Sequence, residues 1–203
     1  CKIGDMQSPI GISVTEKTKL NDIIFHYYPT PLKIINNGHT IQVNSSQGSS
    51  IEVDGQSYNL AQFHFHTPSE HTVNGKRYDM ELHFVHKNEQ GQLAVVGVLM
   101  DKGVNNEALT GLWTALPQEA GAQAELTEEM VLTNLLPANR RVFRYSGSLT
   151  TPPCSEGVKW LLMESPIMVS DAQVQAFQKL FPHNSRPVQP LNNRVVLLDA
   201  DSE

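Results

Sequence analysis

The chain has 203 residues, of which 15 are Lys or Arg and 21 are Asp or Glu, so its formal net charge at pH 7 is −6. This length favours a single domain, residues 1–203, with a sizeable core. The acidic balance, without a long basic run, argues against binding to nucleic acid or to an anionic membrane surface. The longest apolar stretch, residues 93–100, is much shorter than the roughly 20 residues that a membrane-spanning helix needs. We therefore expect a globular domain with neither nucleic acid nor membrane as a partner.

Short apolar runs separated by turn signals predict a chain made mainly of β-strands. Apolar and polar residues alternate over 40–44, 63–66 and 81–86, as in strands with one buried face. Residues 95–100 are apolar throughout, which predicts a strand buried on both faces. Turn-forming dipeptides lie between these runs: Asn37-Gly38, Asp54-Gly55, Asn74-Gly75 and Gln90-Gly91.

Two helices are expected in the second half of the chain. The first is capped by Asn105 or Asn106 and is stopped by Pro117. The second begins at Ser170, which forms a capping box with Gln173. Apolar residues recur at helical spacing in both: Leu109, Leu112, Trp113 and Leu116 in the first, and Val174, Phe177 and Phe181 in the second. Both helices are expected to pack on the surface without a chemical role.

The two cysteines, Cys1 and Cys154, lie 153 positions apart and form no CxxC motif. Three arrangements fit this spacing: a long-range disulfide, two buried thiols, or a lipidated N-terminal cysteine. The sequence begins at Cys1 rather than at Met, so we expect that a preceding segment, such as an export signal, has been removed or left out.

Five of the eight histidines fall within residues 64–86, where even scattering would place about one. Residues i and i+2 of a strand share a face, so His64 and His66 can bind one ion. Phe63 and Phe65 then point to the other face, into a core. The clustering predicts a metal site on this strand.

The next strand supplies a third candidate ligand by the same argument. Glu81 and His83 share one face of it, whereas His86 faces the other way, so strand parity selects His83 and excludes His86. Three imidazoles without a thiolate are typical of catalytic zinc, which keeps an open fourth position. Glu81 could accept the free ring N–H of His83, and Gln62 that of His64, which would fix both tautomers.

An alternative is a cupin-like metal site. His64-x-His66 followed by Glu70 and Gly75 imitates the histidine, glutamate and glycine pattern of that superfamily. The expected second half, Pro-x-Gly before a distant histidine, is missing from the sequence, which disfavours this alternative. The histidines outside the proposed ligand set are interpreted as hydrogen-bonded core residues or as isolated structural or solvated residues: His26, His71, His86 and His183.

Four stretches are distinctive in combination: Gln62-Phe63-His64-Phe65-His66, Ser69-Glu70-His71-Thr72-Val73, Glu81-Leu82-His83-Phe84-Val85-His86 and Gly147-Ser148-Leu149-Thr150-Thr151-Pro152-Pro153. Together they resemble the α-class carbonic anhydrases. Shorter matches extend the resemblance over about residues 4–195. It implies a mainly β fold of the α+β roll type, in which a few short peripheral helices surround a large, twisted, mostly antiparallel central sheet.

The resemblance implies one Zn²⁺ ion bound by the ligands that strand parity also selects, namely His64, His66 and His83. The implied activity is the reversible hydration of CO₂ to bicarbonate and a proton, by attack of a zinc-bound hydroxide. Thr150 would accept the hydroxide's hydrogen bond and donate its own to Glu70, and His39 would pass the released proton to buffer. The groups expected to orient the ligands are Gln62, Glu81 and the main chain of Asn184.

CO₂ is linear and has no net dipole, so its binding pocket should be apolar. Family positions imply a pocket of Val85, Val95, Leu149, Val158 and Trp160, with Thr151 as a polar neighbour. Anions and sulfonamides are the expected inhibitors. The resemblance also allows for a homodimer, the state of many bacterial relatives.

Two further features concern location and function. The Trp- and Tyr-bearing segment that usually precedes the Gln-Ser-Pro motif is absent from this sequence, so part of the pocket rim is expected to be missing or to lie outside the given sequence. Cys154 directly follows Pro153, as in secreted bacterial forms, which implies a Cys1–Cys154 disulfide and a periplasmic or secreted location.

The competing function is a catalytically silent binding domain of the same fold. The presence of Glu70, Thr150 and the three histidines argues against it.

Overall fold

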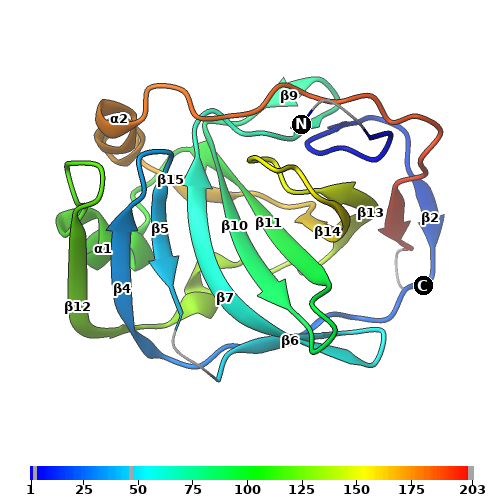
Figure 1. Ribbon diagram of the computed structural model, residues 1–203. Helices are drawn as coiled ribbons and strands as arrows, with labels where there is room; N and C mark the ends of the chain where they lie inside the picture. Colours follow the sequence, from blue (N-terminus) through cyan, green and yellow to red (C-terminus); the bar gives the residue numbers. More distant parts are fainter. Residues whose placement is uncertain (2–3, 46–47, 201–203) are drawn as a thin grey trace.

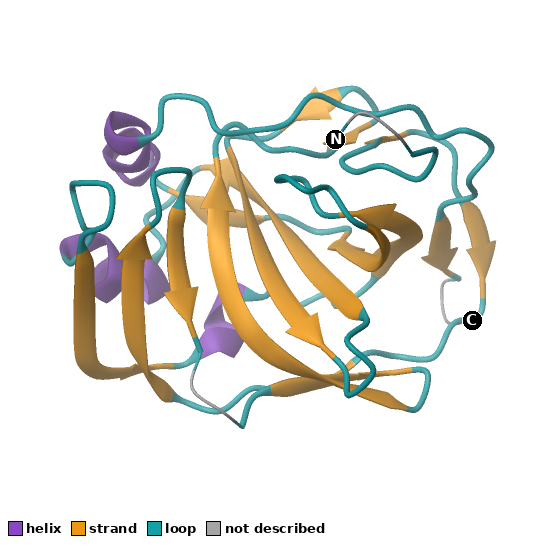
Figure 2. Ribbon diagram, in the orientation of Figure 1, coloured by secondary structure: helices purple, strands orange, loops and turns teal. Residues whose placement is uncertain are grey.

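Most elements of the computed structural model, which describes residue 1, residues 4–45 and residues 48–200, are strands (Figure 1). The strands are β1 (Gly11–Ile12), β2 (Glu16–Thr18), β3 (Ile24–His26), β4 (Thr30–Asn36), β5 (Ile41–Asn44), β6 (Ser50–Val53), β7 (Gln56–His66), β8 (Thr72–Val73), β9 (Lys76–Arg77), β10 (Met80–Lys87), β11 (Leu93–Lys102), β12 (Gln123–Met130), β13 (Val142–Ser148), β14 (Glu156–Met163), β15 (Ile167–Val169) and β16 (Leu197–Asp199). The helices are α1 (Thr110–Thr114), α2 (Asp171–Leu180) and the 3-10 helices η1 (Glu107–Leu109) and η2 (Leu132–Leu135). Figure 2 shows α1 and α2, in purple, toward one side of the body of strands.

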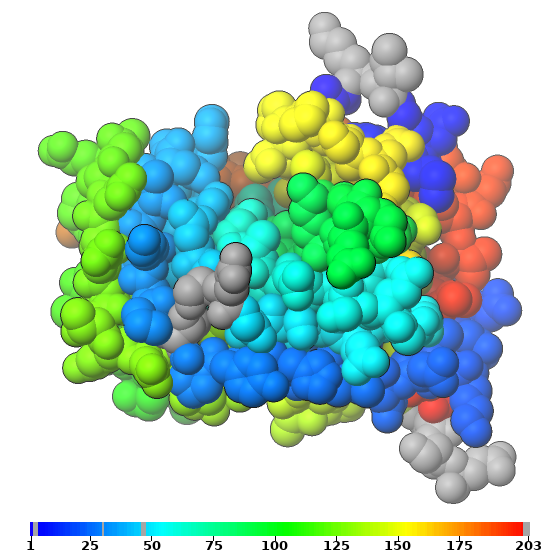
Figure 3. Space-filling model, turned by 60° about the horizontal axis from the view of Figure 1, so that its bottom comes forward, coloured from blue at the N-terminus to red at the C-terminus, as the bar shows by residue number. Residues whose placement is uncertain are grey.

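One large sheet organises the fold. Within the described residues it has thirteen strands, and its main path runs β12-β4-β5-β7-β10-β11-β14-β13-β16-β2, while β1, β8 and β9 form a separate three-stranded sheet. Most strand pairs are antiparallel; the parallel pairs are β11–β14, β11–β15, β16–β2 and β1–β8. Strand β3 pairs with β6 beside the main path, and Figure 3 shows this blue segment lying along the cyan β6–β7 hairpin. The expected fold class is confirmed, including the strong twist of β7, β10 and β11 (Figure 1).

Alternation along the central strands divides their side chains between two apolar clusters, one on each face of the sheet. Phe63 and Phe65 point to the face covered by the helices, where the ring centroid of Phe65 lies 5.0 Å from that of Trp113 and 6.1 Å from that of Phe177. His64 and His66 therefore point to the other face. The second apolar cluster lies on that face and includes Val85, Val95, Leu99, Val158, Trp160 and Leu162. Strand β11 contributes to both clusters, as expected for a strand buried on both faces.

The two expected helices are present, but the first is shorter than its apolar pattern predicts. The Asn106 side chain accepts a hydrogen bond from the Ala108 amide and caps the 3-10 helix η1, and only Thr110–Thr114 is α-helical. Pro117 disfavours a helical conformation in the residue before it, so the chain leaves the helix early. The second helix forms as predicted, with the Ser170 and Gln173 capping box in place.

His86 confirms the prediction of a hydrogen-bonded core histidine. Its Nδ1 lies 3.0 Å from the Ala94 carbonyl oxygen and its Nε2 lies 2.6 Å from the Tyr27 hydroxyl, so both ring nitrogens have partners when the ring is neutral. Burial is the main reason that the pKa of His86 falls from 6.5 to about 4.

We expect this histidine to make the fold sensitive to acid. In the unfolded chain an imidazole takes up a proton near pH 6.5, so between pH 6.5 and 4 the unfolded state binds more protons than the folded state. The free energy of unfolding should therefore fall by about 2 kcal/mol between pH 7.5 and pH 5 through His86 alone. Urea titrations at both pH values measure this loss. The variant His86→Leu should be less stable throughout but should lose about that much less on acidification; an unchanged pH dependence would contradict the assignment.

The N-terminus is attached to the loop between β13 and β14. Cys1 and Cys154 form a disulfide with their Cα atoms 5.2 Å apart, so the long-range disulfide is confirmed over the other two arrangements. The Gln7 side-chain amide donates a hydrogen bond to the Cys154 carbonyl oxygen at 3.1 Å, which is a second contact between the same two segments. Disulfides are typical of oxidising compartments. Among the described residues no helix is long and apolar enough to cross a bilayer.

Candidate metal centre

The pairing of β7 with β10 brings the three candidate ligands together. In this register His83 lies directly opposite His64, and Glu81 lies opposite His66. The ring centroids of the three histidines are 4.7 to 5.3 Å apart, and one ring nitrogen from each lies within 4.8 Å of the others. The three side chains that strand parity selects therefore converge on one point.

Each imidazole uses its outer nitrogen in a hydrogen bond and turns the other inward. Nδ1 of His64 lies 2.8 Å from the Gln62 side-chain oxygen, and Nδ1 of His66 lies 2.9 Å from the Asn184 main-chain oxygen. Nε2 of His83 contacts the Glu81 carboxylate. Since each of these acceptors requires a ring N–H, the inward nitrogens carry the free lone pairs: Nε2 of His64, Nε2 of His66 and Nδ1 of His83.

The surroundings favour neutral imidazoles at two of the three positions. Burial lowers the pKa of His64 well below its ordinary value, and it also lowers the pKa of His66. At His83 burial opposes the charged form, but the Glu81 carboxylate outweighs it and raises the pKa of this ring. A cation at the centre would compete with a second proton on His83, because both need the lone pair of its inward nitrogen.

Glu81 is held in place by a buried chain of hydrogen bonds. Nδ1 of His71 lies 2.8 Å from Oε2 of Glu81, and Nε2 of His71 lies 2.6 Å from the Tyr145 hydroxyl. That hydroxyl donates to the Ser8 hydroxyl at 2.8 Å. Burial alone would raise the pKa of Glu81, but His71 and His83 hold it well below the usual range. His71 is thus a core histidine with both nitrogens engaged, as expected.

Glu70 approaches the centre as a buried carboxylate. Its Oε2 accepts the Arg186 amide N–H at 2.7 Å. Its Oε1 has no hydrogen-bond partner within the described part of the chain and lies 3.3 Å from Nε2 of His66, which has none either. The expected hydrogen bond from Thr150 to Glu70 is therefore not formed in this structure. A buried ring nitrogen and a buried carboxylate oxygen without partners, both facing the same point, fit a site for a cation.

The side chains expected to form the apolar pocket lie together beside this centre. They belong to, or pack against, the apolar cluster on the histidine face of the sheet: Val85, Val95, Leu149, Val158 and Trp160. The Trp160 ring centroid is 4.9 Å from that of His83. Leu149 and Thr150 are half-buried, and Thr151 is exposed.

A cavity of about 310 Å³ opens beside His66. Thr151 and His39 both line it, so the expected polar neighbour and the expected proton acceptor lie at the same opening. His183 lines this cavity too. No other histidine lies near it in the sequence, so its only local link to the centre is its position directly before Asn184.

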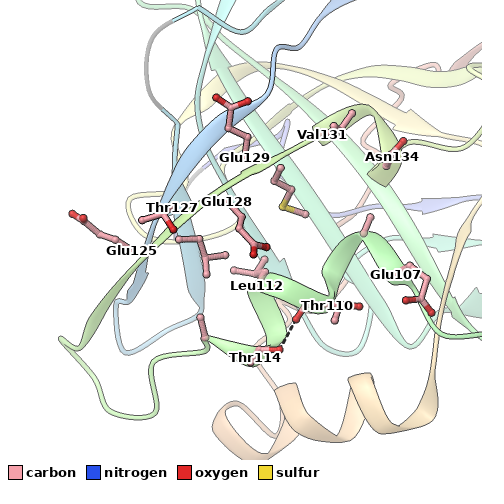
Figure 4. Close-up of a pocket in the computed structure, with 15 residues that line it drawn as sticks. Glu107, Thr110, Leu112, Thr114, Glu125, Thr127, Glu128, Glu129, Val131 and Asn134 are labelled. Carbon is pink, nitrogen blue, oxygen red and sulfur yellow. Dashed lines mark hydrogen bonds between the residues drawn. The ribbon is translucent and has the colours of Figure 1, made fainter.

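A larger cavity, of about 720 Å³, lies elsewhere, between α1 and β12 (Figure 4). Its lining includes four glutamates and no histidine, and Figure 4 shows Glu128 pointing toward Leu112, whereas Glu125 and Glu129 point away. These exposed carboxylates have water as their natural partner. This cavity is therefore separate from the metal centre.

Comparison with known proteins agrees with this geometry. Residues 1–200 match the family described as eukaryotic-type carbonic anhydrase. The chain belongs to this family. A carbonic anhydrase of Klebsiella pneumoniae is 48% identical over 200 residues, which cover 97% of this chain and 81% of the relative, and one of Nostoc sp. is 45% identical over 203 residues, covering 97% and 77%. The solved α-carbonic anhydrase of Thermovibrio ammonificans, in complex with sulfanilamide, has a TM-score of 0.95 and 46% identity over 97% of this chain and 88% of that one.

As a carbonic anhydrase, the chain is an enzyme that catalyses the reversible hydration of CO₂ to bicarbonate and a proton. Neither the cupin-like alternative nor the silent binding domain is favoured by these matches. The enzymes of this family use zinc, and the chemistry of the three-histidine cluster fits that metal.

Proposed function

We propose that His64, His66 and His83 hold the catalytic zinc of this enzyme through their inward nitrogens. The observation that carries the proposal is that all three outer nitrogens are already hydrogen-bonded, to Gln62, Asn184 and Glu81. When bound, zinc with three imidazole ligands keeps an open position at which the pKa of a water falls toward neutrality, as is known for carbonic anhydrases, and so supplies a hydroxide nucleophile.

The second group of residues with metal-binding spacing, His71, Glu81 and His83, is not proposed as a site. Both nitrogens of His71 are engaged, with Glu81 and with Tyr145. Glu81 also accepts the amide N–H groups of Glu70 and His71, at 3.1 and 2.9 Å. These contacts support a role in which Glu81 orients His83 and His71 orients Glu81.

Glu70 and Thr150 are proposed to orient the nucleophile. The main-chain contact with Arg186 fixes Oε2 of Glu70 and leaves Oε1 as an acceptor that faces the centre. In the working enzyme Thr150 would donate its hydroxyl proton to Oε1 and would accept a hydrogen bond with its own oxygen. This selects partners that carry a proton and directs the lone pair of the attacking oxygen toward CO₂.

Groups beside the metal centre are proposed to bind CO₂ and to accept the proton that the reaction releases. Val85, Val95 and Trp160 offer an apolar wall to CO₂, for which desolvation costs little. The reaction releases one proton for each bicarbonate formed, and His39, exposed at the mouth of the cavity, is proposed to accept it and pass it to buffer.

Since the Thermovibrio ammonificans relative was solved with sulfanilamide, we expect sulfonamides and small anions to inhibit this enzyme at the same centre. A periplasmic location is proposed from the disulfide.

Stopped-flow measurement of CO₂ hydration, combined with metal analysis, tests the metal assignment. The protein should contain one zinc per chain, should lose activity when a chelator removes the metal, and should regain it when zinc is returned. Full activity in metal-free protein would overturn the assignment. A folded protein with stoichiometric zinc and no hydration would overturn the proposed roles of the surrounding residues.

Thr150 provides a sharper test of the orienting role. Thr150→Ala should lower kcat/KM for CO₂ by about a hundredfold, the scale of one lost hydrogen bond that acts in the transition state. Thr150→Ser keeps the hydroxyl and should retain most of the activity. Zinc content should be the same in both variants because Thr150 is not a ligand. Equal losses in the two variants would show that packing, rather than the hydroxyl, is what matters.

A further inference from the structure

We propose that His183 is a second proton acceptor of this enzyme, working in parallel with His39. This inference rests on the proposed function, since it concerns the proton that CO₂ hydration releases. His183 is exposed and lines the cavity of about 310 Å³ that opens beside His66, and His39 lines the same cavity. The two exposed imidazoles therefore share one opening.

The other lining groups leave these two rings as the natural proton carriers. The described lining contains no carboxylate, lysine or arginine; its titratable side chains are His39, His66 and His183. His66 is buried and its Nδ1 is engaged with Asn184, so it belongs to the metal centre. An imidazole exchanges a proton near neutral pH more readily than other side chains, and exposure gives buffer molecules access to it.

Asn184 fixes the backbone next to His183 against the metal centre. Its main-chain oxygen lies 2.9 Å from Nδ1 of His66, and its side-chain oxygen accepts the Thr67 amide N–H at 2.7 Å. Its side-chain amide donates to the main-chain oxygens of His39 and Phe65, at 3.0 and 3.1 Å. A single residue thus ties the segment of His183 to the turn of His39 and to a metal ligand.

The turn that carries His39 is anchored as well. The Asn37 side-chain oxygen accepts the amide N–H groups of His39 and Thr40, both at 2.9 Å. Both histidines therefore stand on fixed backbone while their side chains reach solvent. Either imidazole can take the proton, so the loss of one leaves the other to carry it.

Kinetics of the zinc-loaded enzyme in dilute buffer test the proposal. His39→Ala and His183→Ala should each lower kcat about twofold, and the double variant about thirtyfold or more, because each residue covers for the other. kcat/KM for CO₂ should be unchanged in all three variants, since the proton leaves after bicarbonate has formed. Concentrated imidazole buffer should restore kcat of the double variant. His26→Ala is the matched control: His26 is a half-buried histidine hydrogen-bonded to Glu52, outside this cavity, and its loss should change nothing.

NMR signals of the His183 ring supply a readout that is independent of turnover. Because the two rings share one opening, these signals should shift in the His39→Ala variant and on adding imidazole. Signals that respond to neither change would overturn the proposal. So would an unchanged kcat on removing His183 from both the wild-type enzyme and the His39→Ala variant. If kcat/KM and zinc content stay normal in that case, the proposed function stands and only the role of His183 fails.

Discussion

Replacing His83 by alanine is expected to lower CO₂ hydration by at least about a thousandfold, because two imidazoles hold zinc far more weakly than three and free water is a poor source of hydroxide at neutral pH. The loss should appear together in kcat/KM and in zinc content. Stopped-flow assays and metal analysis of the purified variant measure both.

The fold should survive this substitution well enough for the comparison to be made. Glu81, which loses His83 as a partner, keeps its contact with His71 and two main-chain N–H donors. His26→Ala again serves as the matched control, and it should keep its zinc and its activity. A His83→Ala protein that retains stoichiometric zinc and normal activity would show that the metal lies elsewhere.

Loss of the Cys1–Cys154 disulfide is expected to have the largest effect on stability. The disulfide closes a loop of 153 positions, and the loop-entropy relation assigns about 5 kcal/mol to a closure of that length, at the upper end of the 2–5 kcal/mol typical of native disulfides. Cys154 also donates its amide N–H to the Thr151 carbonyl oxygen at 2.8 Å. Breaking the disulfide detaches this loop, which also carries Thr150, from the N-terminus and should lower activity before the protein unfolds.

Denaturant titrations with and without a reductant measure the effect on stability. Reduction should move the unfolding midpoint of the wild-type enzyme down to that of the Cys1→Ser/Cys154→Ser variant, and the variant itself should not respond to reductant. A reductant-independent midpoint in the wild-type protein would show that the disulfide contributes nothing to folding.

Local periodicity was sufficient to find the three histidines that converge on the candidate metal centre. Side chains in a strand alternate between its faces, so the spacing of His64 and His66, and the placement of Glu81 with His83, determined which groups could meet. The same rule correctly excluded His86. The apolar spacing of the first helix predicted a helix that reaches Leu116, but the α-helix ends at Thr114. Periodicity shows which side chains are buried, but it does not show the backbone restriction that Pro117 imposes.

Contacts between distant parts of the chain could not be read in this way. The Tyr145 hydroxyl that supports His71 and the Arg186 amide that fixes Glu70 lie 74 and 116 positions away from their partners. No short-range pattern encodes such pairs. The hydrogen bond from Thr150 to Glu70 was expected from family resemblance alone, and within the described part of the chain it does not form.

The contact between Asn184 and His66 bears on when the centre can be completed during synthesis. All three proposed ligands lie before residue 84, yet the acceptor that orients His66 is a main-chain oxygen 118 positions further along the chain. A chain synthesised only as far as β11 contains all three histidines but can orient only two of them. The last orienting contact has to wait for Asn184, so the site becomes fully arranged only late in synthesis.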